Sequence, residues 1–307
     1  MKILVTGGAG FIGSSIVDAY IKAGHEVVVI DNLSHGKLKN INNKAKFYKA
    51  DINDSKKMEE IFSLEKIDVL NHHAAQIDVR KSVESPIFDA QGNILGTLNL
   101  LQNCVKYKTK KIIFASSGGA IYGECGENPP GEDALASPIS PYGITKRVGE
   151  IYLEYYNRTY GLNYLAFRYS NVYGPKQDSS AEGGVVAIFT QKMLNNEEID
   201  IFSDGEQLRD YVFIEDVVKA DLLGLTKGIN EVINIGTQNT TSVNELFNLV
   251  AKLTNYNKKP IYRPARPCEI KKSLLNIEKA KKILGLQPEI SLNEGLKKTV
   301  EYFKQSR

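Results

Sequence analysis

A glycine-rich turn near the start of the chain places the strongest constraint on its fold. The sequence Gly7-Gly8-Ala9-Gly10-Phe11-Ile12-Gly13 follows the apolar run Ile3–Val5 and precedes a helical stripe that Gly24 ends. Glycines at this spacing let a strand turn tightly into a helix and let that helix pack closely against a sheet. The pattern therefore predicts a strand–turn–helix unit that opens a parallel α/β sheet.

Short apolar runs alternate with helical patterns through the first two-thirds of the chain. Runs of this kind are typical of parallel strands that helices cover on both faces. We predict such strands at Ile3–Val5, Val27–Ile30, Phe47–Tyr48, Ile67–Leu70, Ile112–Ala115 and Tyr164–Phe167, and a seventh strand at Val232–Ile235. The repetition predicts an α/β fold of the Rossmann type, doubly wound around a seven-stranded parallel sheet.

Two later stretches break this rhythm. Turn residues interrupt the chain between Ser170 and Arg209, with a helix expected near Ile188–Leu194, and the lysine-rich end carries a loop at Pro260–Pro267. We expect both stretches to form one smaller α+β lobe that is discontinuous in sequence. Residues 1–170 and about 212–240 would form the dinucleotide-binding domain, and about 171–211 and 241–307 would form the lobe that binds substrate.

Composition and charge narrow the classes of partner. The chain has 307 residues, and its formal net charge of +3 is too small to favour nucleic acid or a membrane surface. No apolar run approaches the ~18 residues of a membrane span, and the N-terminus has no pattern of a secretory signal. Because Cys104, Cys125 and Cys268 lack metal-ligand or redox spacing, we expect no metal site and a cytoplasmic location.

The two adjacent histidines, His72 and His73, do not change the expectation of no metal. Neighbouring residues of a strand point to opposite faces, so the two imidazoles cannot easily bind one ion. We expect them to pack at the strand end.

An acidic residue supports dinucleotide binding at the glycine turn. Asp31 ends the second predicted strand, about twenty residues after the turn, where a carboxylate accepts hydrogen bonds from an adenine ribose. The helix start offers N–H groups and a partial positive charge to the pyrophosphate. A carboxylate repels the 2′-phosphate of NADP, so we predict NAD. Asp51-Ile52 closes the third strand and is either an adenine contact or an ordinary strand end.

A tyrosine and a lysine at helical spacing form the candidate catalytic pair. In Pro141-Tyr142-Gly143-Ile144-Thr145-Lys146 the two side chains lie one turn apart on one helix face. Tyrosine is a poor base at its usual pKa near 10. We expect the Lys146 ammonium, together with an oxidised nicotinamide, to lower the pKa of Tyr142 and favour the phenolate.

Taken in order, these motifs resemble the extended branch of the short-chain dehydrogenase/reductase superfamily, and most closely its UDP-sugar 4-epimerases. The similarity covers essentially the whole chain. It rests on the glycine turn, Asp31-Asn32-Leu33, Asp51-Ile52, His73-Ala74-Ala75, the segment Ser116 to Gly123, Tyr142 with Lys146, and Leu208-Arg209-Asp210-Tyr211.

The resemblance implies a reaction cycle and a set of cofactor contacts. Tyr142 would take the proton of the sugar 4-hydroxyl while the C4 hydride passes to NAD⁺, and Lys146 would hold the nicotinamide ribose. The 4-keto sugar would then rotate about its diphosphate, and the hydride would return to the opposite face of the sugar. The cofactor-binding residues would be Gly7, Gly10, Phe11, Ile12, Gly13, Asp31, Asn32, Ser34, Asp51, Ile52, Ala74, Ala75, Gln76, Asn93, Tyr142 and Lys146.

The segment Ser116-Ser117-Gly118-Gly119-Ala120 departs from the family pattern. Aligned on Tyr122-Gly123, Gly118 stands where the family has a catalytic serine or threonine. Ser117 either replaces that hydroxyl or is an ordinary strand-end residue, in which case water or Tyr142 alone serves. Related nucleotide-sugar dehydratases carry an acidic pair here to eliminate water. Gly119 and Ala120 cannot move a proton, so the sequence argues against dehydratase chemistry.

The lobe supplies the predicted substrate contacts. By the resemblance, Arg209 and Arg266 bind the diphosphate of a UDP-sugar, Asn171 contacts the same region, and Glu269 binds a ribose hydroxyl. The other interpretation of Arg209 is a salt bridge with Asp210 or a neighbour.

Two further positions in the lobe bear on specificity and loop geometry. The small Ser273 leaves room for a 2-acetamido group, so N-acetylated UDP-sugars would be accepted beside UDP-glucose and UDP-galactose. Cys268 stands where the family usually has glycine, and a small buried residue is the stronger interpretation of this thiol.

Three functions remain open on the sequence. The first is an NAD-dependent UDP-sugar 4-epimerase. The second is a net oxidoreductase or decarboxylase acting on a related nucleotide sugar, or a C4 epimerase acting on a UDP-uronic acid. The third is a non-catalytic NAD-binding regulator or scaffold. The resemblance also suggests a homodimer joined through helices near Asn93–Val105 and Tyr142–Tyr160, although the stripe of Ile151, Tyr155 and Arg158 would fit internal packing equally well.

Overall fold

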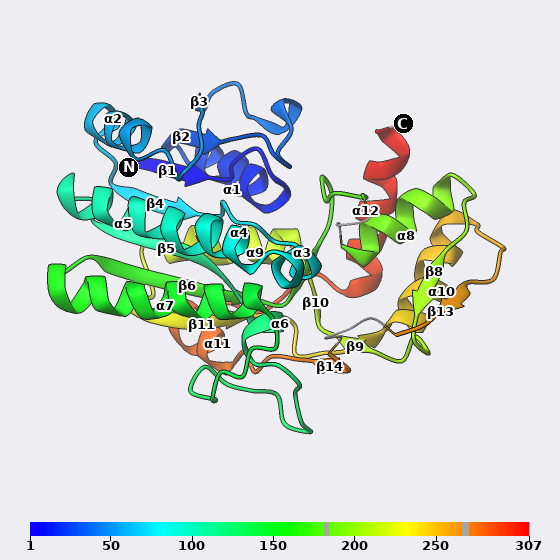
Figure 1. Cartoon of the computed structure of the whole chain (residues 1–307). Helices are drawn as coiled ribbons and strands as arrows, with labels where there is room; N and C mark the ends of the chain where they lie inside the picture. Colours follow the sequence, from blue (N-terminus) through cyan, green and yellow to red (C-terminus); the bar gives the residue numbers. More distant parts are fainter. Residues whose placement is uncertain (181–183, 266–269, 307) are drawn as a thin grey trace.

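A single parallel sheet organises the larger part of the molecule (Figure 1). The computed structural model describes residues 1–180, 184–265 and 270–306. The sheet has seven strands in the order β11-β6-β5-β4-β1-β2-β3, and every neighbouring pair is parallel. The strands are β1 (Lys2–Thr6), β2 (Glu26–Asp31), β3 (Lys46–Lys49), β4 (Val69–His72), β5 (Lys111–Ser117), β6 (Asn163–Tyr169) and β11 (Glu231–Ile235). All seven predicted strands are therefore confirmed.

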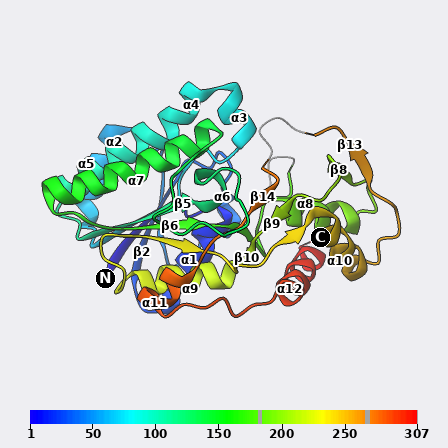
Figure 2. The same ribbon diagram turned by 90° about the horizontal axis from the view of Figure 1, so that it is seen from below.

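Helices cover both faces of this sheet, as Figure 2 shows. On one side lie α2 (Ser55–Glu65), α3 (Val79–Glu84), α4 (Pro86–Ala90), the π-helical η2 (Gln91–Leu95), α5 (Gly96–Lys106) and α7 (Pro141–Tyr160). On the other side lie α1 (Phe11–Lys22), α9 (Ile214–Gly224) and α11 (Glu278–Leu284). Side chains alternate between the two faces along each strand: Ile3 and Val5 join one hydrophobic cluster and Leu4 joins the other. The doubly wound Rossmann-type fold is confirmed.

One strand departs from the expected burial. We predicted that Phe47–Tyr48 would be buried on both faces, but the side chains of β3 are only partly buried or exposed. The reason is its position: β3 is the outermost strand of the sheet, next to β2. An edge strand has a neighbour on one side only, so fewer side chains cover it.

A smaller group of elements lies beside the carboxyl edge of the sheet, at the right of Figure 1. Helix α8 packs against α10 and α12, and β8 pairs with β13. The bounds are α8 (Val185–Leu194), β8 (Asp200–Phe202), α10 (Val243–Thr254), β13 (Ile261–Arg263) and α12 (Leu292–Gln305). The helix expected near Ile188–Leu194 is thus α8. In the described part of the chain, no helix combines the length and apolar character that crossing a membrane requires.

Short elements connect the two groups. Strand β7 pairs in parallel with β10, and β9 lies between β12 and β14. Their bounds are β7 (Asn171–Tyr173), β9 (Leu208–Arg209), β10 (Tyr211–Phe213), β12 (Thr241–Ser242) and β14 (Lys272–Ser273), while η1 (Leu38–Asn40) and α6 (Gly118–Ile121) lie in the connections after β2 and β5. The division of the chain into two domains at the predicted boundaries remains a prediction.

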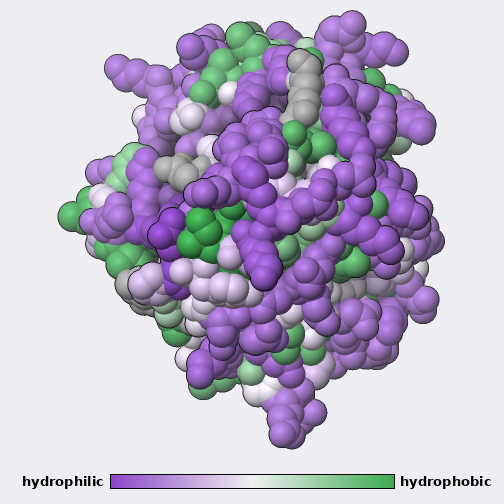
Figure 3. All heavy atoms as spheres, turned by 90° about the vertical axis from the view of Figure 1, so that its right-hand side faces the viewer, coloured by the Kyte–Doolittle hydropathy of each residue, from purple (hydrophilic) through white to green (hydrophobic). Residues whose placement is uncertain are grey.

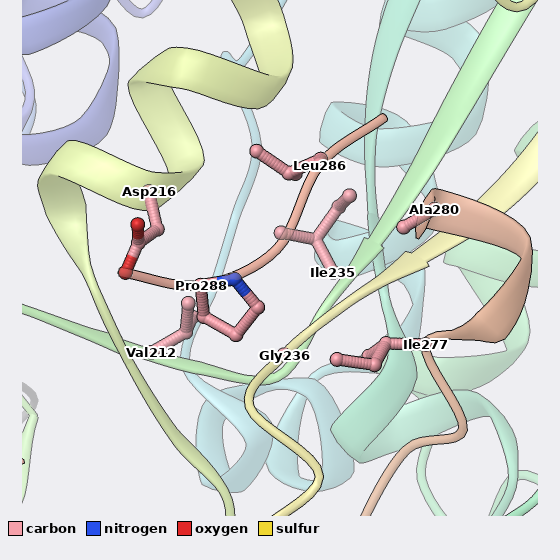
Figure 4. Close-up of a pocket in the computed structure, with 8 residues that line it drawn as sticks. All are labelled: Val212, Asp216, Ile235, Gly236, Ile277, Ala280, Leu286 and Pro288. Carbon is pink, nitrogen blue, oxygen red and sulfur yellow. The ribbon is translucent and has the colours of Figure 1, made fainter. Parts of the chain in front are cut away.

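A small apolar pocket shows how the chain near its C-terminal end packs beneath the sheet (Figure 4). Ile277, Ala280 and Leu286 face Ile235 of β11 across it. Asp216 of α9 is the charged residue of the lining, and its carboxylate accepts hydrogen bonds from the backbone N–H groups of residues 289 and 290 at 2.9 and 3.4 Å. None of the described residues predicted for the site lines this pocket, which is therefore part of the packing rather than of the functional site.

A buried ion pair ties α7 to the sheet. Arg168 of β6 donates to both carboxylate oxygens of Glu150, at 2.8 and 2.7 Å, and both side chains are almost fully buried. Ser116 of β5 donates to the same carboxylate at 2.6 Å, and Arg168 also donates to the Tyr122 hydroxyl at 2.7 Å. Such bidentate geometry offsets the cost of burying two charges.

We predict that Arg168→Met lowers the free energy of unfolding by about 3 kcal/mol or more, because it leaves Glu150 buried with a weaker counter-charge. Urea unfolding followed by circular dichroism measures the change. The control is Arg158→Met, which removes a pair with Glu154 at the surface of the same helix and should change stability little. Equal, small effects of the two substitutions would contradict the role given to the buried pair.

Candidate active site

The glycine turn forms a cradle that only glycine backbone can build. Gly7 has a φ of +70°, and a Cβ added to it would lie 2.7 Å from the backbone nitrogen of Ala74 at the end of β4. A Cβ at Gly13 would lie 2.3 Å from the Gly7 carbonyl oxygen. Phe11 and Ile12 begin α1 directly after this turn. Among the described residues no side chain caps the start of α1. The backbone N–H groups there, and the shape of the glycine turn, therefore suit a dinucleotide pyrophosphate.

The residues predicted to hold the adenosine half gather next to the turn. Asp31 accepts hydrogen bonds from the backbone N–H groups of Ala9, at 3.0 Å, and Leu33, at 2.8 Å. Asn32 donates to Asp51 at 2.9 Å and accepts from the Ser34 backbone at 3.0 Å. The carboxylate of Asp31 is thereby fixed at the carboxyl end of β2, where a ribose would meet it.

Three other predicted cofactor residues have side chains that are engaged within the protein. Ile52 packs in the hydrophobic cluster beneath α5. Gln76 donates from its side chain to Asp89 at 2.8 Å, and Asn93 exchanges hydrogen bonds with the Gln76 backbone at 2.8 and 3.0 Å. Contacts from Ala74, Ala75 and these three residues to a cofactor remain predictions.

Tyr142, Lys146 and Ser117 meet at the carboxyl end of β5. Helix α7 begins with Ser140 as its N-cap and Pro141 in its first turn, which places Tyr142 and Lys146 one turn apart. The buried Lys146 ammonium donates to the Ala115 carbonyl at 2.7 Å and lies 5.8 Å from the centre of the Tyr142 ring. The Ser117 hydroxyl lies close enough to the Tyr142 phenol to lower the pKa of that phenol by hydrogen bonding. The structure thus brings the three predicted catalytic residues together.

The pKa values of the pair differ from our expectation. Burial raises the pKa of Tyr142 to about 12, the hydrogen bond from Ser117 lowers it, and the negative charge of Asp89 raises it. Burial lowers the pKa of Lys146 to about 8, against the attraction of Asp89 and Glu150. In the protein without cofactor, desolvation of the phenolate dominates, and the combined effect of Lys146 and an oxidised nicotinamide on Tyr142 stays a prediction.

The structure explains the missing hydroxyl at Gly118. A Cβ at this position would lie 2.6 Å from the side chain of Leu275. Leu275 thus occupies the space that a serine or threonine side chain at position 118 would need. Ser117 is the last residue of β5 and precedes the short helix α6, and from there its hydroxyl reaches Tyr142. This geometry favours Ser117 over an ordinary strand-end residue.

The predicted lobe residues that the structure describes lie on the short strands beside this site. Ser273 of β14 pairs with Arg209 of β9, and the Ser273 hydroxyl lies 3.6 Å from the position that a Cβ on Gly119 would take. Asn171 donates from its side chain to the Asp210 carbonyl at 3.2 Å. Arg266, Cys268 and Glu269 lie outside the described residues.

The alternative interpretation of Arg209 named Asp210 or a neighbouring residue as its ion-pair partner. The Asp210 carboxylate instead accepts hydrogen bonds from the backbone N–H groups of Thr237 and Gln238 and from the Thr237 hydroxyl. Arg209 donates to the backbone carbonyls of Leu208 and Lys271, at 2.9 and 3.4 Å.

The two histidines point to opposite faces of the sheet. His72 contacts the hydroxyl of Thr6 at 2.7 Å and that of Thr97 at 3.0 Å, and burial together with Lys146 and His73 lowers its pKa well below the usual value. His73 stacks on Tyr169 and lies 3.6 Å from Asp221.

Sequence reasoning missed two residues of this site, Asp89 and Thr145. Asp89 of α4 is fully buried, and its carboxylate accepts a hydrogen bond from the Thr145 hydroxyl at 3.0 Å. Their signal in the sequence is positional only: Asp89 precedes Asn93 by one helical turn, and Thr145 directly precedes Lys146. An aspartate on a short helix is far commoner at the surface, so this signal was too weak to use.

Comparison with known proteins identifies the family. The model of the family described as "NAD dependent epimerase/dehydratase family" matches residues 3–236. A putative UDP-glucose 4-epimerase of Methanocaldococcus jannaschii is 49% identical over 304 residues, covering 99% of each chain.

Two solved structures share the fold over the whole chain. The UDP-glucose 4-epimerase of Thermotoga maritima, solved with UDP-glucose, has a TM-score of 0.98 and 54% identity, covering 100% of this chain and 99% of that one. The enzyme of Thermus thermophilus, solved with NAD, has a TM-score of 0.96 and 38% identity, covering 100% of both chains. The chain belongs to the NAD dependent epimerase/dehydratase family, and the resemblance drawn from its sequence is confirmed.

We predict that Ser117→Ala lowers turnover by about tenfold or more, because it removes the hydrogen bond to the phenol of Tyr142. That bond lowers the pKa of Tyr142, so its loss raises the pKa and moves the acidic limb of the kcat–pH profile to higher pH. Steady-state kinetics across pH measure both effects.

The control is Ser63→Ala on α2, whose exposed hydroxyl donates to the Glu60 carbonyl, away from α7 and the catalytic residues. This variant should keep the pH profile of the unaltered protein. Unchanged turnover in Ser117→Ala would remove Ser117 from the mechanism.

Proposed function

We propose that this protein is an NAD-dependent 4-epimerase of UDP-sugars and that UDP-glucose and UDP-galactose are its substrates. The observation that carries the proposal is the meeting of Ser117, Tyr142 and Lys146 at the same sheet edge as the glycine cradle. The family and the named relatives support the same reaction class. The product is a stereoisomer, so the reaction leaves no net oxidation.

The chain's own residues account for the proton movements. Tyr142 takes the proton of the sugar 4-hydroxyl and returns it after the 4-keto sugar has rotated. Ser117 donates a hydrogen bond to the phenolate that this requires. Lys146, with a pKa of about 8, carries its positive charge at neutral pH and opposes the desolvation that disfavours the phenolate.

The cofactor site fits NAD. When bound, NAD⁺ supplies an acceptor for the C4 hydride and a positive charge near the phenol. The turn from Gly7 to Gly13 would hold the pyrophosphate, and Asp31 would accept hydrogen bonds from the adenine ribose and reject a 2′-phosphate. Lys146 would bind the nicotinamide ribose.

The lobe would hold the nucleotide and place the sugar. Arg209 with Arg266 would bind the diphosphate, Asn171 would contact the same region, and Glu269 would bind the uridine ribose. Ser273 is small and faces Gly119, which leaves space beside the sugar. We therefore include N-acetylated UDP-sugars among the substrates.

Incubation of the purified protein with a panel of UDP-sugars, without added NAD, tests the proposal. We expect interconversion of UDP-glucose and UDP-galactose, and of the two N-acetylated counterparts, detected by chromatography of the products. Tyr142→Phe should lower the rate by at least about a hundredfold, because it removes the general base. Normal turnover of UDP-galactose without turnover of UDP-N-acetylglucosamine would refute the N-acetyl part alone.

The same panel separates the competing functions. A net oxidoreductase or decarboxylase would change NADH absorbance stoichiometrically or release CO₂, and a uronic acid epimerase would act on UDP-glucuronic acid alone. A regulator or scaffold would keep its function in Tyr142→Phe. Each of these results would overturn the proposed reaction.

We further propose that the protein is a homodimer joined through the predicted helices near Asn93–Val105 and Tyr142–Tyr160, extended here to the neighbouring α4. Exposed apolar side chains gather on these helices, whereas hydrophilic residues cover most of the face of the lobe in Figure 3. The exposed apolar residues are Ile87, Phe88, Leu95, Ile144, Ile151 and Tyr155. Exposed apolar side chains gathered on neighbouring helices are typical of a protein–protein interface.

We predict that Ile87→Asp shifts the protein from dimer to monomer, because it places a charge in the apolar contact. Size-exclusion chromatography with light scattering measures the mass. Ile87 is 75% exposed; the control is Leu135→Asp, at a residue that is 90% exposed on the loop after α6 and outside the proposed interface. A monomeric unaltered protein, or a dimer that survives Ile87→Asp unchanged, would contradict this interface.

We also propose a cytoplasmic location. The described cysteines, Cys104 and Cys125, are buried free thiols. Reduced buried cysteines are typical of proteins kept in a reducing compartment.

A further inference from the structure

Asp89 is a buried carboxylate whose hydrogen-bond donors in the described chain are all neutral. It lies on the inner side of α4, fully buried, while its neighbours Ile87 and Phe88 are exposed on the outer side. Its Oδ1 accepts from Gln76 at 2.8 Å and from Asn93 at 3.1 Å, and its Oδ2 accepts from the Thr145 hydroxyl at 3.0 Å. Burying a negative charge without a directly bonded cation is costly, so such a group is kept where its charge is used.

The helix that carries Asp89 changes its winding at this point. α4 continues into the π-helical segment η2, which contains Asn93, and then into α5. The side chain of Asn93 bonds back to Asp89 and also donates to the Thr145 hydroxyl at 3.2 Å. π-helical turns are rare and occur frequently at functional sites, where they redirect side chains.

The hydrogen bonds of Asp89 reach the first turn of α7, where the proposed catalytic residues lie. The Thr145 hydroxyl has one proton and lies 3.0 Å from both Asp89 and the Tyr142 carbonyl oxygen. Gln76, on the other side of Asp89, belongs to the segment after β4 that was predicted to contact the cofactor. Asp89 therefore links the connection after β4, the π-helical segment and the start of α7.

The charge of Asp89 acts on the same two groups. Lys146 is attracted by Asp89 and by Glu150, but the Glu150 carboxylate is already paired with Arg168 and with Arg147. The charge of Asp89 has no such directly bonded cation in the described chain, so it is the less neutralised of the two carboxylates that act on Lys146.

Other charged and titratable groups lie around this cluster. On α7 they are Tyr142, Lys146 and Glu150. On β4 the group is the neutral His72, whose pKa the charge of Lys146 helps to lower. On α3, Lys81 lies over the exposed ring of Phe88, on the outer side of α4. Burial raises the pKa of Asp89, while hydrogen bonds from Thr145 and Gln76 and the charge of Lys146 lower it.

We propose that Asp89 is a positioning residue of the epimerase site, which fixes the start of α7 through Thr145 and supplies the negative charge that faces Lys146. The inference rests on the proposed 4-epimerase function and deepens it. Asp89 touches neither substrate nor the reacting atoms and acts through Lys146 and Tyr142.

Asp89→Asn tests the charge while keeping the shape. The asparagine oxygen can accept from Gln76 and Asn93, and its amide can donate to Thr145, whose proton then goes to the Tyr142 carbonyl. Removing a negative charge lowers the pKa of both Lys146 and Tyr142. We expect the acidic and alkaline limbs of the kcat–pH profile to move together to lower pH, by about one pH unit, with KM for the UDP-sugar little changed.

A control variant and a second pair of test variants separate this role from a loss of folding. Asp216→Asn removes a buried carboxylate that caps backbone N–H groups under α9, and it should leave the pH profile in place. Thr145→Val removes a hydrogen bond that lowers the pKa of Asp89 and so favours its charged form. This variant should therefore move the profile in the same direction by a smaller amount, and Thr145→Ser should restore the profile. The Thr145 pair also provides the test if Asp89→Asn does not fold. Thermal unfolding and the NAD retained after gel filtration are measured for every variant.

The outcomes are distinguishable. A joint move of both limbs in Asp89→Asn, absent from Asp216→Asn, supports the proposal. A lower maximum with both limbs in place, or a profile identical to that of the unaltered protein, overturns it and leaves the epimerase function standing. An unaltered protein without epimerase activity overturns the proposed function itself.

Discussion

The placement of α7 over β5 and β6 is the constraint on which the rest of the site depends. Glu150 accepts hydrogen bonds from Ser116 and Arg168 on those two strands, and Lys146, one turn earlier, donates to the carbonyl of Ala115. These bonds are buried, where water cannot replace them, so a shift of the helix along the sheet would leave charges unpaired. The position of Tyr142 beside Ser117 follows from this anchoring.

The two sides of α7 differ in polarity. Its inner side meets a chain of buried polar groups, and its outer side carries exposed apolar residues such as Ile144 and Ile151. α4 repeats this division, with Asp89 inside and Ile87 outside. If the outer side joins a second copy, as proposed, the interface lies one helix thickness from the catalytic residues. The rigidity of that contact would then support the geometry of the site.

Desolvation decides the electrostatics of the catalytic pair. The sequence places a lysine one turn from a tyrosine, and we expect this lysine, together with an oxidised nicotinamide, to favour the phenolate. Burial instead raises the pKa of Tyr142 to about 12 and lowers that of Lys146 to about 8, so each group is driven toward its neutral form. Hydrogen bonds and fixed charges then act against this penalty, Ser117 on the phenol and Asp89 on the ammonium. Their effect depends on distances that spacing in the sequence does not contain.

The sequence by itself determined the fold class, the seven strands and the residues that form the glycine cradle. These follow from local rules: apolar runs set buried strands, and close backbone approach demands glycine at Gly7 and Gly13. Only the tertiary structure decided that Leu275 fills the space at Gly118, that the Ser117 hydroxyl reaches Tyr142, and that Asp89 lies buried against Thr145 of α7. Each of these depends on contacts between segments far apart in the chain, and burial and packing across such distances have no periodic signature in the sequence.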